Sequence, residues 1–420
     1  MRPVTHRLAP VDEVNLVLDR AGQVNVFLVA GLLEPGGFVG PDGTPDLAVL
    51  RSCLGERIGT VPQLGKIAVA TGRRHRWVQA RPDLEHHVRL IEAVDGPAGL
   101  ARKCGELMDV PLGLDRPLWE ILVVPGAAVR GTGIVLRIHH ALADGATATA
   151  IVQQLFDPTE ARGPASAPPV RAPEKVRRDA RQVLGRLRFG LRRMRMTLRG
   201  REVGSTVLLG PRSRQRGVVF LDAGLAALER HVRPLGATVN DALLAAAASG
   251  YRAALSDAGE RLPARLPVSV PVALQRRGTP ANQVGIMLVR LPLGDVEPDE
   301  RVRLIAEQTR EEKVRAREQG TLEFMRGPTG ARIMDRIGRR QHLVAGFVTN
   351  VPGPAGMLRL AGAPVGALWP VTVLAANVRL GVAALSYAGR LRCSVHFDAE
   401  NVSGVAFARA MDGELARLGT

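Results

Sequence analysis

The sequence predicts an α/β fold of layered helices and sheets, arranged as two domains of similar size. Its 420 residues exceed one ordinary domain. Short apolar runs typical of strands alternate with long helical patterns. A Pro/Ala-rich and then basic segment at 157–212 separates 1–156 from 213–420. The hydrophobic fraction of 46% and the charged fraction of 23% exclude a disordered chain.

In the first half, a strand and a helix are expected in direct succession. Residues 133–138 (GIVLRI) form the continuous apolar run of a buried strand. Residues 146–156 (ATATAIVQQLF) place apolar side chains at helical spacing. The loop between such elements is a usual place for functional groups, because rigid elements hold it and solvent reaches it.

In the second half, residues 238–255 predict a long Ala-rich helix. Residues 299–318 predict a charged helix with Val302, Ile305 and Val314 facing inward. Strands are expected at three places, namely 266–272, 284–291 and 390–397. Helices and separated strands again predict layered α/β architecture.

Positive charge is concentrated in the segment between the halves. The chain has 57 Lys and Arg against 40 Asp and Glu, and residues 171–216 hold fifteen basic and three acidic residues. An apolar stripe runs along this segment at helical spacing, at Leu187, Leu191, Met194 and Leu198. The stripe favours either a linker helix packed on its own domains or contact with an anionic membrane or lipid-droplet surface. Phe189 is the single aromatic residue of the run, so nucleic acid is not expected as a partner.

The sequence predicts a cytoplasmic protein whose contact with a membrane is peripheral. It contains no apolar run of transmembrane length, and its first residues lack a secretory signal pattern. Cys53, Cys104 and Cys393 lie far apart and have no zinc-site spacing, which is typical of a reducing compartment.

The sharpest chemical signal follows the strand at 133–138, where His139, His140, Asp144 and Gly145 form an HHxxxDG pattern. A neutral imidazole can take the proton of a hydroxyl at physiological pH, so acyl transfer is the chemistry that fits. Asp144 either sets the tautomer of a histidine or pins the loop, and Gly145 permits a close approach. The alternatives are two core histidines beside a capping aspartate, or a metal-binding pair. No HExxH sequence supports metal, and no GxSxG sequence supports a serine nucleophile.

Further motifs accompany this pattern in order along the chain: WVQARPDLEHHVRL from Trp77, PLW at Pro117-Leu118-Trp119, ND at Asn240-Asp241, PVSV at 267–270, NQV at 282–284, TNVPGP from Thr349-Asn350, and SYAGRL at 386–391 followed by Asp398. With them the sequence resembles the bacterial wax ester synthase/diacylglycerol acyltransferase family of the CoA-dependent acyltransferase superfamily. The resemblance extends from about residue 10 to about residue 410, apart from the linker.

The resemblance implies two chloramphenicol-acetyltransferase-like domains that form a pseudo-dimer with the active site between them. It implies that His140 is the general base, beside His139 and Gly145, and that Asp144 is architectural. Asn350 or the Thr349 hydroxyl is the candidate donor to the oxyanion. Neither a metal, a cofactor nor a covalent acyl-enzyme is implied, since acyl-CoA is a co-substrate.

The other motif residues carry structural alternatives. Pro117, Leu118 and Trp119 are expected to be packing residues or part of an acyl tunnel wall. Asn240 begins a long helix, so it either caps that helix or lines the site.

The expected activity is O-acyl transfer from acyl-CoA to a long-chain alcohol or diacylglycerol, giving a wax ester or triacylglycerol. The alternative enzyme acylates a non-lipid alcohol or an amine, with an acyl carrier protein as donor. A basic binding protein with inactive histidines is the alternative from another class.

Overall fold

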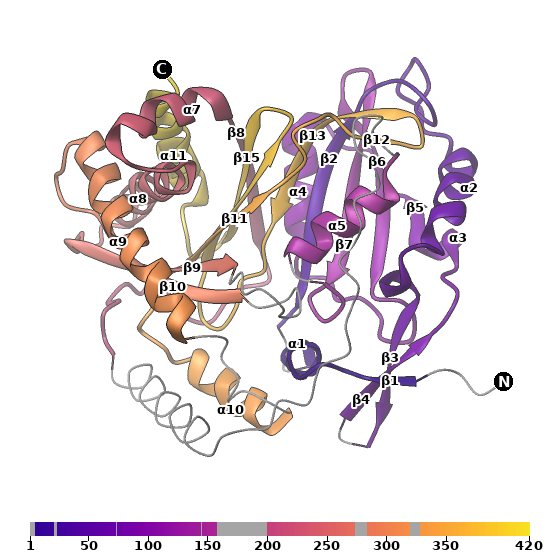
Figure 1. Ribbon diagram of the computed structural model, residues 1–420, viewed down its shortest axis with the longest axis horizontal. Coiled ribbons are helices and arrows are strands. Elements are labelled where there is room, and N and C mark those ends of the chain that lie inside the picture. The colour runs from indigo at the N-terminus through magenta and orange to yellow at the C-terminus, as the bar shows by residue number, and fades with distance from the viewer. Residues whose placement is uncertain are drawn as a thin grey trace.

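The computed structural model describes residues 5–20, 23–72, 74–143, 145–157, 200–273, 284–319 and 328–420. Two six-stranded sheets stand next to each other, each flanked by helices, and a small three-stranded sheet projects from the N-terminal half (Figure 1). The small sheet consists of β1 (Thr5–Arg7), β4 (Arg74–Gln79) and β3 (Lys66–Thr71). The layered α/β fold predicted from the sequence is therefore confirmed.

The N-terminal sheet carries the predicted active-site strand at its centre. Its elements and their covering helices are β2 (Val26–Leu33), β5 (Val88–Leu90), β6 (Trp119–Ala128), β7 (Gly131–His139), β12 (Arg359–Leu360), β13 (Ala363–Val371), α2 (Leu47–Ile58), α3 (Leu84–His87), α4 (Gly96–Leu107) and α5 (Gly145–Leu155). The strand order is β12-β13-β2-β7-β6-β5. Every residue of β7 is buried, because α4 covers one face of the sheet and α2 and α5 cover the other.

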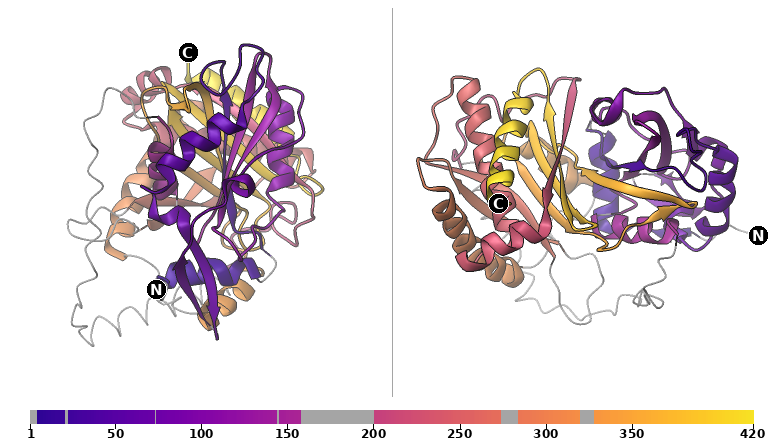
Figure 2. Two further views of the ribbon diagram at one scale, coloured as in Figure 1. Left: turned by 90° about the vertical axis from the view of Figure 1, so that its right-hand side faces the viewer. Right: turned by 90° about the horizontal axis from the view of Figure 1, so that it is seen from above.

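The sheet of the N-terminal half is completed by a strand from the C-terminal half of the sequence. The antiparallel pairing of β13 with β2 sets Leu368 opposite Gly31. A Cβ on Gly31 would lie 2.9 Å from Leu368 Cδ2, so glycine permits this close approach. Seen from above, the orange and yellow strands extend from one half to the other (Figure 2). The simple division into 1–156 and 213–420 therefore does not include β12 and β13, which come from the C-terminal half and join the N-terminal sheet.

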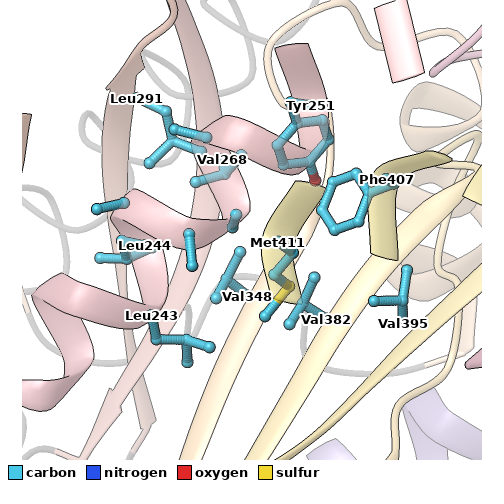
Figure 3. Packing of buried hydrophobic residues seen from close by; sticks show 14 of the residues in the cluster. Leu243, Leu244, Tyr251, Val268, Leu291, Val348, Val382, Val395, Phe407 and Met411 are labelled. Atoms are coloured by element: carbon cyan, nitrogen blue, oxygen red, sulfur yellow. The ribbon is translucent and has the colours of Figure 1, made fainter. Parts of the chain in front are cut away.

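The C-terminal sheet has the strand order β10-β9-β11-β14-β15-β8. The bounds in this half are β8 (Arg216–Gly224), β9 (Arg265–Ala273), β10 (Val284–Pro292), β11 (Phe347–Pro352), β14 (Leu380–Tyr387), β15 (Arg390–Asp398), α7 (Leu225–Val232), α8 (Val239–Asp257), α9 (Pro298–Gln319), α10 (Pro328–Gly338) and α11 (Gly404–Leu418). Between α8, α11 and the sheet lies a tight core, in which Tyr251 meets Phe407 edge-on at 5.0 Å and Met411 lies near Val382 (Figure 3).

The predicted strands and helices are found close to their expected bounds, with one wrong detail in α9. Val302 and Ile305 are fully buried, but Val314 is 55% exposed. At 100° per residue, Val314 lies about 120° around the helix from Val302, which turns it away from the buried stripe.

Part of the segment predicted as linker belongs to the C-terminal core. Val203, Leu208 and Leu209 are buried there, although the sequence places them within 157–212. Their apolar side chains pack on the domain and leave the linker shorter than expected. The stripe at 187–198 lies outside the described residues. Within the ranges described, no helix is both long and apolar enough to cross a membrane.

Candidate active site

The two histidines lie at the end of β7, between its two neighbouring strands. The His139 N–H donates to the Leu118 carbonyl, at 3.0 Å, just ahead of β6. The His140 N–H donates to the Asn25 carbonyl, at 2.9 Å, just ahead of β2. Hydrogen bonds on both sides of the strand end therefore fix the backbone of the motif.

His139 is fully buried and its ring holds the turn. Its Nδ1 accepts a hydrogen bond of 2.9 Å from the Ala141 N–H, so the neutral ring carries its proton on Nε2. That nitrogen lies 3.5 Å from Asp19 Oδ2. The Leu142 N–H donates to the His139 carbonyl, which closes the turn. These contacts give His139 a positioning role.

His140 is half-buried, and its ring centroid lies 4.9 Å from that of Phe27, tilted by 59°. Its carbonyl accepts a hydrogen bond of 3.0 Å from Asn15 Nδ2. With its N–H bound to the Asn25 carbonyl, both backbone groups are fixed while the ring remains partly accessible. This is the arrangement that a general base needs.

Three polar residues, Asn15, Asp19 and Asn25, form a network that supports both histidines. Asn15 and Asp19 lie on α1 (Pro10–Arg20), and Asn25 directly precedes β2. Asn25 Nδ2 donates to Asn15 Oδ1 at 2.9 Å, and its N–H donates to Asp19 Oδ1 at 2.7 Å. No sequence motif indicates this network. The one sequence feature that points to it is the alternation of apolar and polar residues along α1.

The C-terminal half reaches the motif through β11. A Cβ added to Gly145, the first residue of α5, would lie 3.2 Å from Val351 Cγ2. Thr349 and Asn350 are on the same strand and half-buried, and their side chains make no hydrogen bond to any described residue. The structure therefore brings the TNVPGP segment beside the histidine motif. Asp144 lies outside the described residues.

Alternation along β11 separates its two polar residues. Successive side chains of a strand point to opposite faces. Thr349 therefore shares the face of Val351, which packs on the N-terminal core, and Asn350 shares the face of Val348, which is in the C-terminal core. Of the two oxyanion donors predicted from the sequence, Thr349 is therefore the one on the face of β11 that meets the N-terminal half.

The PLW motif lies in the core beside the site. Trp119 is 1% exposed, its indole N–H donates to the Leu64 carbonyl at 2.7 Å, and its ring stacks on His87 at 4.6 Å. Pro117 and Leu118 are buried as well. Burial lowers the pKa of His87, whose Nδ1–H donates to the Trp119 carbonyl. The contacts of these side chains are those of packing residues.

Asn240 does not cap its helix. The N-cap of α8 is Thr238, which forms a capping box with Asp241. Asp241 also accepts a hydrogen bond of 2.7 Å from Thr309 Oγ1, which ties α8 to α9. The hydrogen bonds of the described residues do not connect Asn240 with His140. Among the residues described, no group of three His, Cys, Asp or Glu could hold a metal ion.

A histidine motif at a strand end, in contact with a second half that is also built on a six-stranded sheet, is the arrangement of two-domain CoA-dependent acyltransferases. The wax ester synthase/diacylglycerol acyltransferase catalytic domain matches residues 8–205, and the C-terminal domain of the same family matches residues 281–418. The chain belongs to this family, as the motifs predict.

Similar proteins agree with this assignment. A probable diacylglycerol O-acyltransferase of Mycobacterium tuberculosis, tgs1, is 28% identical across 82% of this chain and 78% of its own. The structure of a wax ester synthase/diacylglycerol acyltransferase from Marinobacter aquaeolei VT8 matches with a TM-score of 0.72 at 21% identity, covering 98% of both chains. A trichothecene 15-O-acetyltransferase from Fusarium sporotrichioides matches with a TM-score of 0.67 at 11% identity, covering 100% of this chain and 95% of its own. These structural matches confirm the fold.

Proposed function

We propose that the protein is an O-acyltransferase that moves an acyl group from acyl-CoA to the hydroxyl of a long-chain alcohol or diacylglycerol. One observation carries the proposal. The half-buried His140, fixed at the end of β7, belongs to a motif whose Gly145 lies against Val351 of β11 in the opposite half, in a chain of the wax ester synthase/diacylglycerol acyltransferase family. The relatives named diacylglycerol O-acyltransferases support this substrate class.

His140 acts as general base in a direct transfer. Its imidazole takes the proton of the acceptor hydroxyl while the oxygen attacks the thioester carbonyl. The tetrahedral intermediate collapses, the carbon–sulfur bond breaks, and the leaving thiolate receives the proton from His140. The products are an ester and free CoA. Base strength alone does not suffice, because the negative oxygen of the intermediate needs a positioned donor. Thr349 is that donor, with Asn350 as the alternative on the same strand.

The neighbours of His140 position it. His139 and Asp19 fix the turn, and Gly145 lets the loop approach Val351. Asp144 keeps the architectural role that the family resemblance implies. Asn240 is also proposed as a residue of the site, because Asn240-Asp241 matches the ND motif of the family.

A lipid acceptor requires contact with a lipid surface. We propose that the protein is cytoplasmic and binds an anionic membrane or lipid-droplet surface peripherally. The support is the excess of basic residues between Arg171 and Arg216, since basic amphipathic segments bind anionic lipid.

The test is thiol release from a panel of acyl-CoAs with hexadecanol, diacylglycerol and a short alcohol as acceptors. We expect release that depends on a lipid acceptor and is lost in His140→Ala. His231→Ala, which alters a partly exposed histidine on α7, is the matched control and should retain activity. Absence of acceptor-dependent release with every donor would contradict the proposed substrates.

A further inference from the structure

A second feature of the interface lies apart from the histidine motif. A cavity of about 360 Å³ opens between the two halves. Gln23, Val24 and Met108 form its N-terminal wall, and the C-terminal half contributes the arginines Arg212, Arg216 and Arg339. The volume is within the range of small-molecule sites.

The cavity carries more positive than negative charge. Arg216 is 10% exposed and pairs with Asp109, the carboxylate of the lining, at 3.3 Å. Arg212 donates to the Ala376 carbonyl at 2.7 Å, and within the described ranges no carboxylate lies within 4.0 Å of it. Burial, followed by the charges of Arg216 and Arg339, lowers the pKa of Arg212 to about 10. Arg339 pairs with Asp335 at 2.9 Å, so among these three arginines only Arg212 has no carboxylate of the described residues within 4.0 Å.

A buried histidine, His396, is also part of the cavity lining. His396 is 1% exposed, and its Nδ1–H donates to the Thr372 carbonyl at 2.7 Å. Its Nε2 therefore carries a lone pair, and it has no hydrogen-bond partner among the described residues. Burial lowers the pKa of His396 to about 3, so the ring is neutral at physiological pH. A buried acceptor without a partner is costly, and a ligand hydroxyl or amide N–H would satisfy it.

We propose that this cavity binds a phosphate group of a ligand that carries a hydroxyl or amide N–H beside that phosphate. Guanidinium groups bind phosphate through paired, charge-assisted hydrogen bonds, and His396 Nε2 accepts from the neighbouring donor. The inference rests on the proposed function when the ligand is the CoA thioester, which combines phosphates, a hydroxyl and amides. A phosphorylated acceptor shares this chemistry.

The location couples the cavity to the reaction site. Val24 of the wall directly precedes Asn25, whose carbonyl holds the His140 backbone. The Gln23 side chain accepts a hydrogen bond of 3.1 Å from the Ala376 N–H of the other half. A phosphate bound here therefore lies at the seam between the halves, beside the segment that positions His140.

The experiment is isothermal titration of the full-length protein with free CoA, glycerol 3-phosphate and inorganic pyrophosphate. The variants are Arg212→Gln and Arg339→Gln. The Arg339 side chain is 46% exposed, so its replacement is expected to disturb folding less than replacement of the less exposed Arg212. Arg230→Gln on α7 is the matched control, because Arg230 is exposed and is not part of the lining. We expect at least tenfold weaker binding of one probe or more in both variants, and unchanged binding in the control.

The pattern of losses identifies the source of the phosphate. Weakened CoA binding assigns the cavity to the donor, weakened glycerol 3-phosphate binding to a phosphorylated acceptor, and weakened pyrophosphate binding alone to a free anion. Unchanged affinity for every probe in folded Arg212→Gln and Arg339→Gln would overturn the proposal. The ligands in these titrations carry no acyl group, and the titrations are repeated in His140→Ala. The binding result can therefore be interpreted even if the proposed acyl transfer does not occur.

Discussion

Two adjacent histidines have different roles because the end of β7 gives them different surroundings. His139 is enclosed and uses Nδ1 to hold the Ala141 N–H, with Asp19 near its other nitrogen. His140 is held by its backbone, and its ring lies beside Phe27. The two residues are chemically identical, but His139 is fully buried and His140 is only half-buried.

Asn25→Ala tests the support network. The change removes the hydrogen bonds that join Asn25 to Asn15, while the backbone carbonyl that holds His140 stays. We expect kcat to fall about tenfold, a loss of about 1.4 kcal/mol in transition-state stabilisation, with little change in KM. Asn401→Ala, which removes a side-chain hydrogen bond to Asp398, serves as control. An unchanged kcat in Asn25→Ala would refute a positioning role.

Thr349→Val tests the oxyanion donor. The substitution keeps the side-chain shape and removes the hydroxyl on the face shared with Val351. We expect kcat to fall by about 10²-fold, the usual cost of losing one oxyanion-hole donor. Single-turnover rates measure the effect. A larger loss in Asn350→Leu than in Thr349→Val would show that the donor points from the opposite face.

The buried His396 makes stability depend on pH. Its folded-state pKa is lowered to about 3 by burial, whereas the unfolded chain titrates near 6.5. The unfolded state therefore binds the proton first, and the free energy of unfolding falls as pH drops from about 6.5 towards 3. Urea unfolding at pH 7.5 and pH 4.5 should show a smaller loss in His396→Gln than in the wild type. An equal loss in both proteins would contradict this assignment.

At the scale of elements, the local apolar pattern predicted the helices and strands whose formation depends on residues close together in the sequence. The buried run of β7, the following α5 and the long α8 were readable because each has a strong apolar pattern. The pairing of β13 with β2 was not, because it joins segments more than three hundred residues apart. The support network was not predicted either, since Asn15 and Asp19 resemble ordinary polar positions of an amphipathic helix.

Gly31→Val tests the pairing of β13 with β2. A Cβ there would approach Leu368 Cδ2 at 2.9 Å and the Ala367 carbonyl oxygen at 3.0 Å. We expect the free energy of unfolding to fall by about 1–3 kcal/mol, the typical cost of overpacking. Gly413→Ala on α11 is the control, because open space surrounds that Cβ and alanine favours a helix. Equal stability of Gly31→Val and wild type would argue against the pairing.

At the scale of the whole molecule, the site exists because two halves meet. The motif lies on the N-terminal sheet, its opposing strand β11 comes from the C-terminal sheet, and the strand pair β13–β2 joins both halves. The sequence predicted the HHxxxDG and TNVPGP segments as partners through family resemblance. Neither motif predicted the arginine-lined cavity. Its residues Arg212, Arg216 and Arg339 lie outside both motifs and are brought together by tertiary packing.

The central claim is that His140 transfers the proton in a direct acyl transfer. The most direct test follows ester and free CoA together in single turnovers of wild type, His140→Ala and His231→Ala, with circular dichroism to verify folding. We predict equal amounts of ester and CoA in the wild type and in His231→Ala. In His140→Ala the rate should be lower by about 10²–10⁴-fold, as for a lost general base. Ester formation by folded His140→Ala at the wild-type rate would contradict the account.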